Sequence, residues 1–285
     1  MSEELEVFLP DDIDETVATD PRDLVVISIP KMGKGCILGD FSVKYNALVF
    51  DLEKGGYEYI KARKITTYPK ESTSAIEAYD NYIDYREALL KEKGKYKFLI
   101  IDGLSDLDKM SEIGGTIAYM HTTIGKHFNK HNPKDPRKEA PKYKPGDKDF
   151  KSVLTLADGA GYQHTRRWFL QQVEFFRQIS PYRIYAAHIV DKYIKEDGKD
   201  EVMGSEIALT GQLKRIFASK VTSLAKLFAD DTKRYLNFEV LNDSIIAGSR
   251  APKLKGKILI SEQAEDDSIS TFWENIYSRE CLINK

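Results

Sequence analysis

Short, continuous apolar runs alternate along the chain with longer segments in which apolar residues recur at helical spacing. A short apolar run between turn residues is typical of a strand buried on both faces. Such strands alternating with helices indicate a mainly parallel sheet with helices on both faces. We therefore predict an α/β fold. The predicted strands cover residues 24–28, 46–52, 96–102 and 183–187, and the predicted helices cover 36–44, 74–93 and 162–178.

The C-terminal third has a different pattern. A charged, glycine-containing stretch, 191–205, predicts a loop, and the periodic segment 212–229 predicts a helix. Shorter apolar segments at 236–240, 244–250 and 257–262 indicate an antiparallel extension of the sheet. No internal repeat or second domain is visible. The expected organisation is an acidic N-terminal arm (1–22), one domain (23–261) and a C-terminal tail (262–285).

The loop between the first strand and the first helix has the composition of a phosphate-binding loop. Glycines let successive backbone N–H groups curve around a phosphate, the following helix points its N-terminus at the anion, and a lysine reaches the terminal phosphates. Two positions depart from the G-x-x-x-x-G-K-[ST] pattern: Ser28 replaces the first glycine, and Gly35 replaces the hydroxyl residue that helps to hold Mg²⁺. A plain strand–turn–helix with a surface lysine is the alternative. The residues predicted to contact a nucleotide are Pro30, Lys31, Met32, Gly33, Lys34, Gly35 and Cys36.

Acidic residues and a histidine end the other predicted strands. Ligands of parallel α/β sheets bind at the carboxyl ends of the strands, so these residues are expected to converge. Phosphoryl transfer needs positive charge on the phosphates, a carboxylate that holds a metal ion and a group that orients the attacking water. A solvated turn for the acids and a structural role for the histidine are the simpler alternatives. We assign the phosphates to Lys34, Mg²⁺ to Asp102, the water to Glu53 and detection of the terminal phosphate to His188.

A basic insertion spans about 125–151 and contains nine Lys/Arg against four Asp/Glu, with aromatic residues between them. Lysine and arginine interleaved with aromatic residues are typical of contacts with single-stranded nucleic acid, although most such stretches are solvated loops. Four histidines, His121, His127, His131 and His164, lack the spacing and partners of a zinc site. The candidate DNA-binding residues are Lys126, Lys130, Lys134, Arg137 and Lys138.

Composition describes an ordinary globular protein. The 285 residues are 41% hydrophobic and 31% charged, and the formal net charge of −2 gives no overall attraction to nucleic acid or membrane. The two cysteines, Cys36 and Cys281, indicate a reducing compartment rather than a disulfide framework. The acidic start predicts no signal peptide, and no apolar stretch predicts a membrane span. We expect a cytoplasmic protein.

The motifs PKMGKG, LVFDLEKGG, FLIIDGLSDL, GYQHTRRWFLQQVEFF, YAAH and AGSRAPKL, in this order, resemble those of the phage nucleotide-binding ATPases of the RecA superfamily, the group that includes Sak-type single-strand annealing proteins. The resemblance covers 23–261. It implies a RecA-like P-loop NTPase core with a degenerate Walker A motif, ATP and Mg²⁺ as cofactors, and a homo-oligomer that acts on single-stranded DNA in recombination or replication.

Residue by residue, the resemblance matches Lys34 to the P-loop lysine, Glu53 to the water-activating glutamate, Asp102 to the Walker B aspartate and His188 to the sensor position. It also suggests that Arg250 reaches the nucleotide of a neighbouring subunit. Gly35 places hydrolysis in more doubt than binding. The alternatives are a degenerate, non-hydrolysing relative with a structural, assembly or DNA-scaffolding role, and a different P-loop enzyme such as a small-molecule kinase.

Overall fold

A central mixed sheet organises the chain. The computed structural model describes residues 18–130, 142–196, 199–239, 247–266 and 268–283. Within these residues one sheet of 11 strands runs in the order β11-β10-β8-β7-β1-β5-β4-β2-β3, with β6 paired to β5 and β9 paired to β7. The strands are β1 (Asp23–Ser28), β2 (Ala47–Asp51), β3 (Lys64–Thr66), β4 (Phe98–Asp102), β5 (Tyr182–Glu196), β6 (Lys199–Ile207), β7 (Ser223–Asp230), β8 (Lys233–Asn237), β9 (Gly248–Ser249), β10 (Lys257–Gln263) and β11 (Ile269–Thr271).

The strands from β3 to β7 in this order pair in parallel, whereas β8, β10 and β11 continue the sheet in antiparallel pairing. The predicted α/β fold with a mainly parallel core and an antiparallel C-terminal extension is therefore confirmed. The helices are α1 (Lys34–Lys44), α2 (Ala75–Lys91), α3 (Leu104–Met120), α4 (Gly161–Ile179), α5 (Leu213–Lys220) and α6 (Arg279–Leu282), with short 3₁₀ turns η1 (Gly125–His127), η2 (Val153–Thr155), η3 (Ala157–Gly159) and η4 (Trp273–Asn275).

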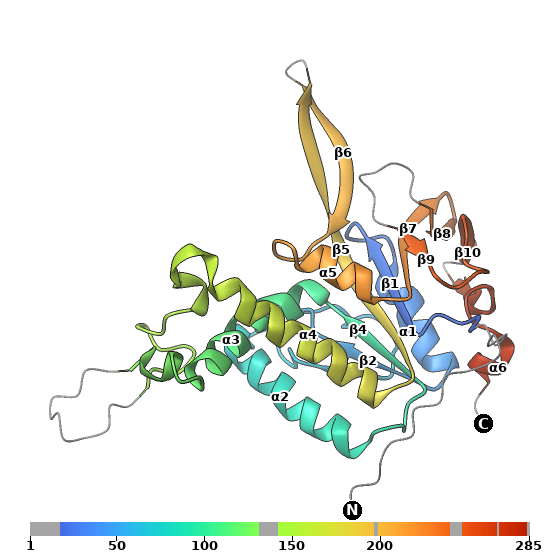
Figure 1. The fold of residues 1–285 in the computed structure, drawn as a ribbon. Coiled ribbons are helices and arrows are strands. Elements are labelled where there is room, and N and C mark those ends of the chain that lie inside the picture. The colour runs from blue at the N-terminus through green and yellow to red at the C-terminus, as the bar shows by residue number, and fades with distance from the viewer. Residues whose placement is uncertain (1–17, 131–141, 197–198, 240–246, 267, 284–285) are drawn as a thin grey trace, which may run out of the picture.

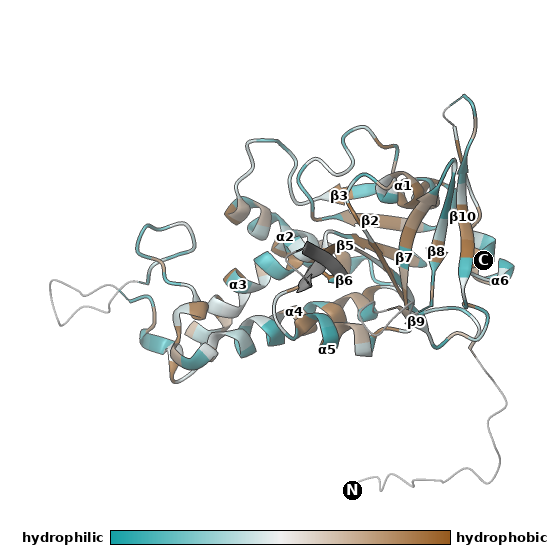
Figure 2. Ribbon diagram, turned by 90° about the horizontal axis from the view of Figure 1, so that it is seen from above, coloured by the Kyte–Doolittle hydropathy of each residue, from teal (hydrophilic) through white to brown (hydrophobic). Residues whose placement is uncertain are grey.

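Helices cover both faces of the sheet. Successive side chains along each strand point to opposite faces, so they pack into two separate hydrophobic cores. On β1, Val25 and Ile27 pack in the core beneath α2, α3, α4 and α5, whereas Leu24 and Val26 pack beneath α1 and α6. Figure 1 shows α2 and α4 on one side of the sheet and α1 on the other, and the hydropathy colours mark the central strands as apolar (Figure 2). Strands buried on both faces explain why the sequence shows continuous apolar runs there.

A local signal fixes the start of one helix, and a close contact between helices fixes the packing of another. Helix α2 begins with a capping box, in which the Ser74 side chain accepts from the Glu77 N–H and the Glu77 carboxylate accepts from the Ser74 N–H. Helix α3, which we did not predict from the sequence, packs tightly on α4. A Cβ atom at Gly114 would lie 2.2 Å from the Trp168 ring, so only glycine permits this approach.

The segment expected as a C-terminal tail packs into the core on the α1 side. Trp273, Ile276 and Tyr277 are almost fully buried, and the Trp273 ring lies 4.5 Å from that of Phe41 on α1. These residues bury apolar surface on the face of the sheet that α1 covers only in part, and this burial stabilises the fold.

Two predictions of secondary structure are wrong. The segment 212–229 is helical only over α5, and its second half is β7, because pairing with β1 through Leu24↔Ser223 to Ile27↔Lys226 overrides its helical periodicity. The stretch 191–205 is not a loop. Most of it lies in the antiparallel hairpin of β5 and β6, which stands out from the rest of the molecule (Figure 1).

The two ends of the basic insertion are tied together. The Asn129 amide donates to the Lys151 carbonyl at 2.8 Å and accepts from the Lys151 N–H at 2.7 Å. An isolated antiparallel β-bridge pairs the backbones of Lys130 and Lys142. Residues 131–141, and with them Lys134, Arg137 and Lys138, lie outside the described part of the chain.

Candidate functional site

The sheet brings the four predicted strand-end residues to one edge. Strand β4 ends at Asp102 opposite Asp51 of β2 and Ala186 of β5, and Ser28 at the end of β1 pairs with His188. Because these strands are parallel, the residues that follow them meet above their carboxyl ends.

A chain of charged contacts joins these residues. The Lys34 ammonium lies 3.0 Å from Asp102 Oδ1 and 3.6 Å from Glu53 Oε1. The other neighbour of Glu53 Oε1 is His188 Nε2, at 3.1 Å. The structure therefore places Lys34, Glu53, Asp102 and His188 in one cluster, as their positions at strand ends predict.

The loop before α1 has the backbone of an anion-binding turn. Lys31 and Gly33 have positive φ angles of 66° and 82°, and Gly33 caps α1 without a side-chain hydrogen bond to the first turn. No acidic residue lies in that turn, so its N–H groups and the positive end of the helix dipole are not matched by a local carboxylate. Pro30 and Lys31 are exposed, whereas Met32, Gly35 and Cys36 are half-buried.

Lys34 is the cation at the centre of the site. Only 8% of its side chain is exposed, and burial lowers the pKa of its ammonium, but the charges of Asp102 and Glu53 outweigh burial and raise the pKa above its ordinary value. Lys34 Nζ, Glu53 Oε1 and Asp102 Oδ1 are buried and have no aligned hydrogen bond among the described residues. The two carboxylates engage at most two of the three N–H donors of Lys34, so at least one donor is open to an anion.

Two residues that we did not assign to the site complete its acidic side. Tyr57 donates a hydrogen bond of 2.8 Å to Asp102 Oδ2. Burial raises the pKa of Asp51 to about 7, the nearby charges of Asp102 and Glu53 act in the same direction, and the Glu53 N–H bonded to Asp51 Oδ1 opposes them. Asp51 was visible as a strand-end acid, but no sequence signal points to Tyr57.

The structure gives a packing reason for Gly35. The loop after β2 folds over the first turns of α1 and places Ile60 against Gly35 and Gly39. A Cβ atom would lie 2.9 Å from Ile60 Cδ1 at position 35 and 2.6 Å from Ile60 Cγ2 at position 39. The G-x-x-x-G spacing on a helix was the sequence signal for this contact, and we did not use it.

The residues fit phosphate better than they fit a metal ion alone. The remaining N–H donor of Lys34, the αL turn at Gly33 and the helix N-terminus all suit an anion. Among the described residues no group of three or more His, Cys, Asp or Glu is arranged to hold a metal ion. Mg²⁺ usually keeps several waters and binds one or two carboxylates together with substrate phosphates, so Asp102 suits it only beside a bound nucleotide.

The remaining predicted residues lie elsewhere. Arg250 donates its N–H to the Thr222 carbonyl and its Nη2 to the Ser219 carbonyl, before the start of β7. This is the edge of the sheet opposite to Lys34, so Arg250 is outside the site of its own chain, and its contact with a neighbouring subunit stays a prediction. Lys126 is exposed in η1 and Lys130 is half-exposed, both at the base of the insertion.

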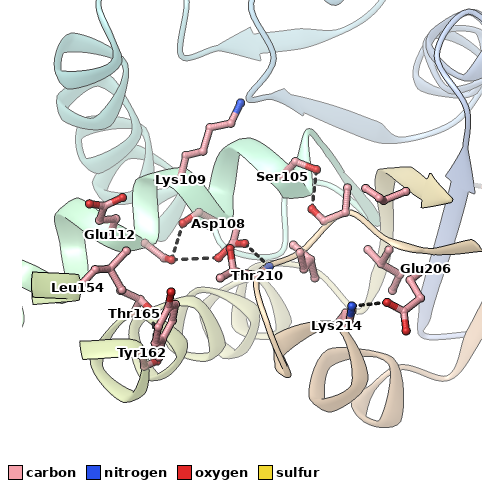
Figure 3. A pocket seen from close by; sticks show the side chains of 15 residues that line it. Ser105, Asp108, Lys109, Glu112, Leu154, Tyr162, Thr165, Glu206, Thr210 and Lys214 are labelled. Atoms are coloured by element: carbon pink, nitrogen blue, oxygen red, sulfur yellow. Dashed lines mark hydrogen bonds and ion pairs between the residues drawn. The ribbon is translucent and has the colours of Figure 1, made fainter. Parts of the chain in front are cut away.

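A pocket of about 480 Å³ lies beside β5, between α3, α4, α5 and the end of β6 (Figure 3). The backbone links it to His188, because the Ala208 N–H donates to the His188 carbonyl and Ser105 donates to the Ala208 carbonyl, both at 2.9 Å. Two of its three acids are engaged: Asp108 accepts from the Thr210 N–H at 2.7 Å, and Glu206 pairs with Lys214. The third is Glu112. No feature of the sequence indicated this pocket.

Neither a protein family nor a curated protein matches the sequence. Among solved structures, the chain has a distant similarity to an ATPase from the type III secretion system of pathogenic bacteria, with a TM-score of 0.39 and 10% sequence identity. The match covers 77% of this chain and 60% of that one. At this distance the likeness carries no argument about activity. No described helix has the length and apolar character that a membrane crossing requires.

Proposed function

We propose that this chain is a RecA-like P-loop protein that binds ATP with Mg²⁺ at the carboxyl edge of β1, β2, β4 and β5, and that it hydrolyses the nucleotide. The observation that carries the proposal is Lys34. A buried, charged ammonium with at least one N–H donor open to an anion stands between a glycine turn, a helix N-terminus and two carboxylates at strand ends. The ammonium, the glycine turn and the helix N-terminus favour a polyphosphate over a neutral ligand, and the carboxylates suit a metal ion bound beside it.

The residues divide the work of phosphoryl transfer as follows. Lys34 and the first N–H groups of α1 bind the terminal phosphates and stabilise the charge that develops on them. Glu53 orients the attacking water and takes up its proton, and His188, 3.1 Å away, holds the Glu53 carboxylate in place. Bound Mg²⁺ would neutralise charge on the β- and γ-phosphate oxygens, and Asp102 is the residue that would hold it.

The finer proposal is that the protein belongs to a phage recombination or replication system and acts on single-stranded DNA as a homo-oligomer. The order of the six motifs supports it, as do the exposed Lys126 and the half-exposed Lys130 at the base of the basic insertion. Phosphate contacts release counterions, so the affinity for single-stranded DNA should fall steeply as salt rises.

A second candidate is a protein that binds nucleotide without hydrolysing it and serves as a scaffold. Two contacts favour it. Ile60 fills the side of α1 where a metal-binding hydroxyl would project from position 35, and Tyr57 engages the second oxygen of Asp102. Both contacts reduce the oxygen ligands open to Mg²⁺.

The test is ATP binding and hydrolysis by the purified protein with Mg²⁺, with and without single-stranded DNA. We expect Lys34→Ala to weaken ATP binding by at least about tenfold, because a charge-assisted contact with phosphate contributes about 1.5–3 kcal/mol. Lys93→Ala, an exposed lysine just beyond α2, is the control and should bind ATP like the parent. Equal ATP affinity of Lys34→Ala and the parent would overturn the site, whereas binding without turnover would favour the scaffold.

A further inference from the structure

Arg234 reaches the phosphate loop from the antiparallel part of the sheet. It lies on β8, which is separated from β1 by β7, and its Nε donates to the Met32 carbonyl at 3.1 Å. A Cβ atom at Gly33 would lie 2.8 Å from the same Nε. The guanidinium therefore lies directly against the loop, and the glycine at position 33 makes room for it.

The hydrogen bonds of Arg234 are incomplete. Its Nη2 lies 3.4 Å from Gln263 Oε1, and its Nη1 is buried without a hydrogen-bond partner among the described residues. A buried donor that stays unpaired on a cation is costly, and a guanidinium offers several N–H groups in a fork that matches phosphate oxygens. The position of Arg234 beside the loop thus favours an anionic partner.

The charge balance of the site points the same way. The charge of Lys34 is offset by Asp102 and Glu53, which lie on the β4 and β2 side of the loop. Arg234 lies on the other side of β1, and within the described ranges no ion pair joins it to a carboxylate. The loop therefore lies between Lys34, whose charge is balanced by carboxylates, and Arg234, whose charge is not.

We propose that Arg234 is a second phosphate-binding residue of the site, contributed by the same chain and placed across the loop from the carboxylates. It binds a phosphate oxygen of the bound polyphosphate through Nη1, while its Nε keeps the hydrogen bond to the Met32 carbonyl. The proposal rests on the function proposed above, in that it makes the loop a polyphosphate site. With Arg234 in this role, the phosphate site contains an arginine of its own chain and does not depend on one from a neighbouring subunit.

The experiment compares Arg234→Gln and Arg234→Lys with the parent. Arg279→Gln is the matched control, because it removes an exposed arginine of α6, which lies beside the start of β4 at the opposite edge of the sheet. Binding of ATP, pyrophosphate and adenosine is measured by calorimetry, together with the melting temperature of the ligand-free proteins. We expect Arg234→Gln to weaken ATP and pyrophosphate about 10- to 100-fold and to leave adenosine unchanged. Arg234→Lys should recover part of the loss because it keeps the charge.

The outcomes separate this proposal from the function. If Arg234→Gln binds ATP and pyrophosphate like the parent, the role of Arg234 is overturned and nucleotide binding stands. If the parent binds pyrophosphate but not ATP, and Arg234→Gln weakens the binding of pyrophosphate, the phosphate-binding role of Arg234 is supported and the proposed nucleotide function is refuted. If the parent binds neither ligand, both fall. An equal loss for adenosine, or a lowered melting temperature without recovery in Arg234→Lys, would show a structural role and overturn the proposal.

Discussion

Ile60 packs so closely on Gly35 that a Cβ atom at position 35 would lie 2.9 Å from Ile60 Cδ1. The absence of a hydroxyl residue at the start of α1 is thus coupled to the loop that follows β2. Restoring the hydroxyl requires a change in both residues, since one methyl group of Ile60 occupies the space.

The first prediction concerns this pair. Gly35→Ser should lower the free energy of unfolding by about 1–2 kcal/mol through overpacking. The double variant with Ile60→Val, which removes Cδ1, should recover most of it and hydrolyse ATP faster with Mg²⁺ than the parent does. Urea unfolding and steady-state hydrolysis measure the two effects.

The control for this pair is Gly39→Ser. Its Cβ atom would meet Ile60 Cγ2, which valine retains, and the Lys61 carbonyl at 3.0 Å, so Ile60→Val should not rescue it. A well-folded Gly35→Ser/Ile60→Val protein with no gain in turnover would show that an oxygen at position 35 does not limit hydrolysis.

The second prediction concerns Glu53. Glu53→Gln keeps the shape of the side chain but cannot accept the proton of the attacking water, so kcat should fall by about 100-fold or more. ATP affinity should stay within about threefold of the parent, since Lys34 and Asp102 remain 3.0 Å apart. Glu58→Gln, an exposed residue of the same loop, should hydrolyse ATP like the parent. Parental turnover in Glu53→Gln would refute the assignment.

The third prediction concerns pH. Burial raises the pKa of Asp51 from its ordinary value of 3.8 to about 7, so the folded state binds this proton more tightly than the unfolded chain does. Stability contributed by protonated Asp51 is therefore complete below about pH 4 and is lost as pH rises towards 7. Relative to Asp51→Asn, the parent should lose on the order of 1–4 kcal/mol over this window.

Urea unfolding of the parent and Asp51→Asn between pH 4 and pH 8 measures this difference. Asp80→Asn, on the exposed face of α2, should follow the parent throughout. Parallel curves for the parent and Asp51→Asn would mean that Asp51 stays ionised across the range.

The sequence predicted the part of the site that strand ends determine. Asp102 ends β4, and His188 lies in register with Ser28 at the end of β1 although β5 continues beyond it, so parallel pairing brings both to the same edge of the sheet whatever the details of the loops. Tyr57, Ile60 and Arg234 were not predicted, because each reaches the site by the path of a loop or from a distant strand. Those approaches depend on tertiary packing, which has no local pattern.

The wrong elements have the same cause. Residues 223–229 carry large apolar residues at 224, 227 and 228, the spacing of a helix face, and pairing with β1 decides for a strand instead. The hairpin of β5 and β6 was predicted as a loop because its residues are charged. Its strands pair with each other outside the core, so no apolar run marks them.

Strand β5 runs without interruption from the middle of the sheet, past His188, to Glu196 in the hairpin. At about 3.3 Å per residue, the eight residues beyond His188 form an arm of roughly 26 Å. A tilt of about 10° at its base would carry the far end through about 4–5 Å, given that arm length. A small tilt of β5 beside Glu53 would therefore produce a larger displacement at Glu196.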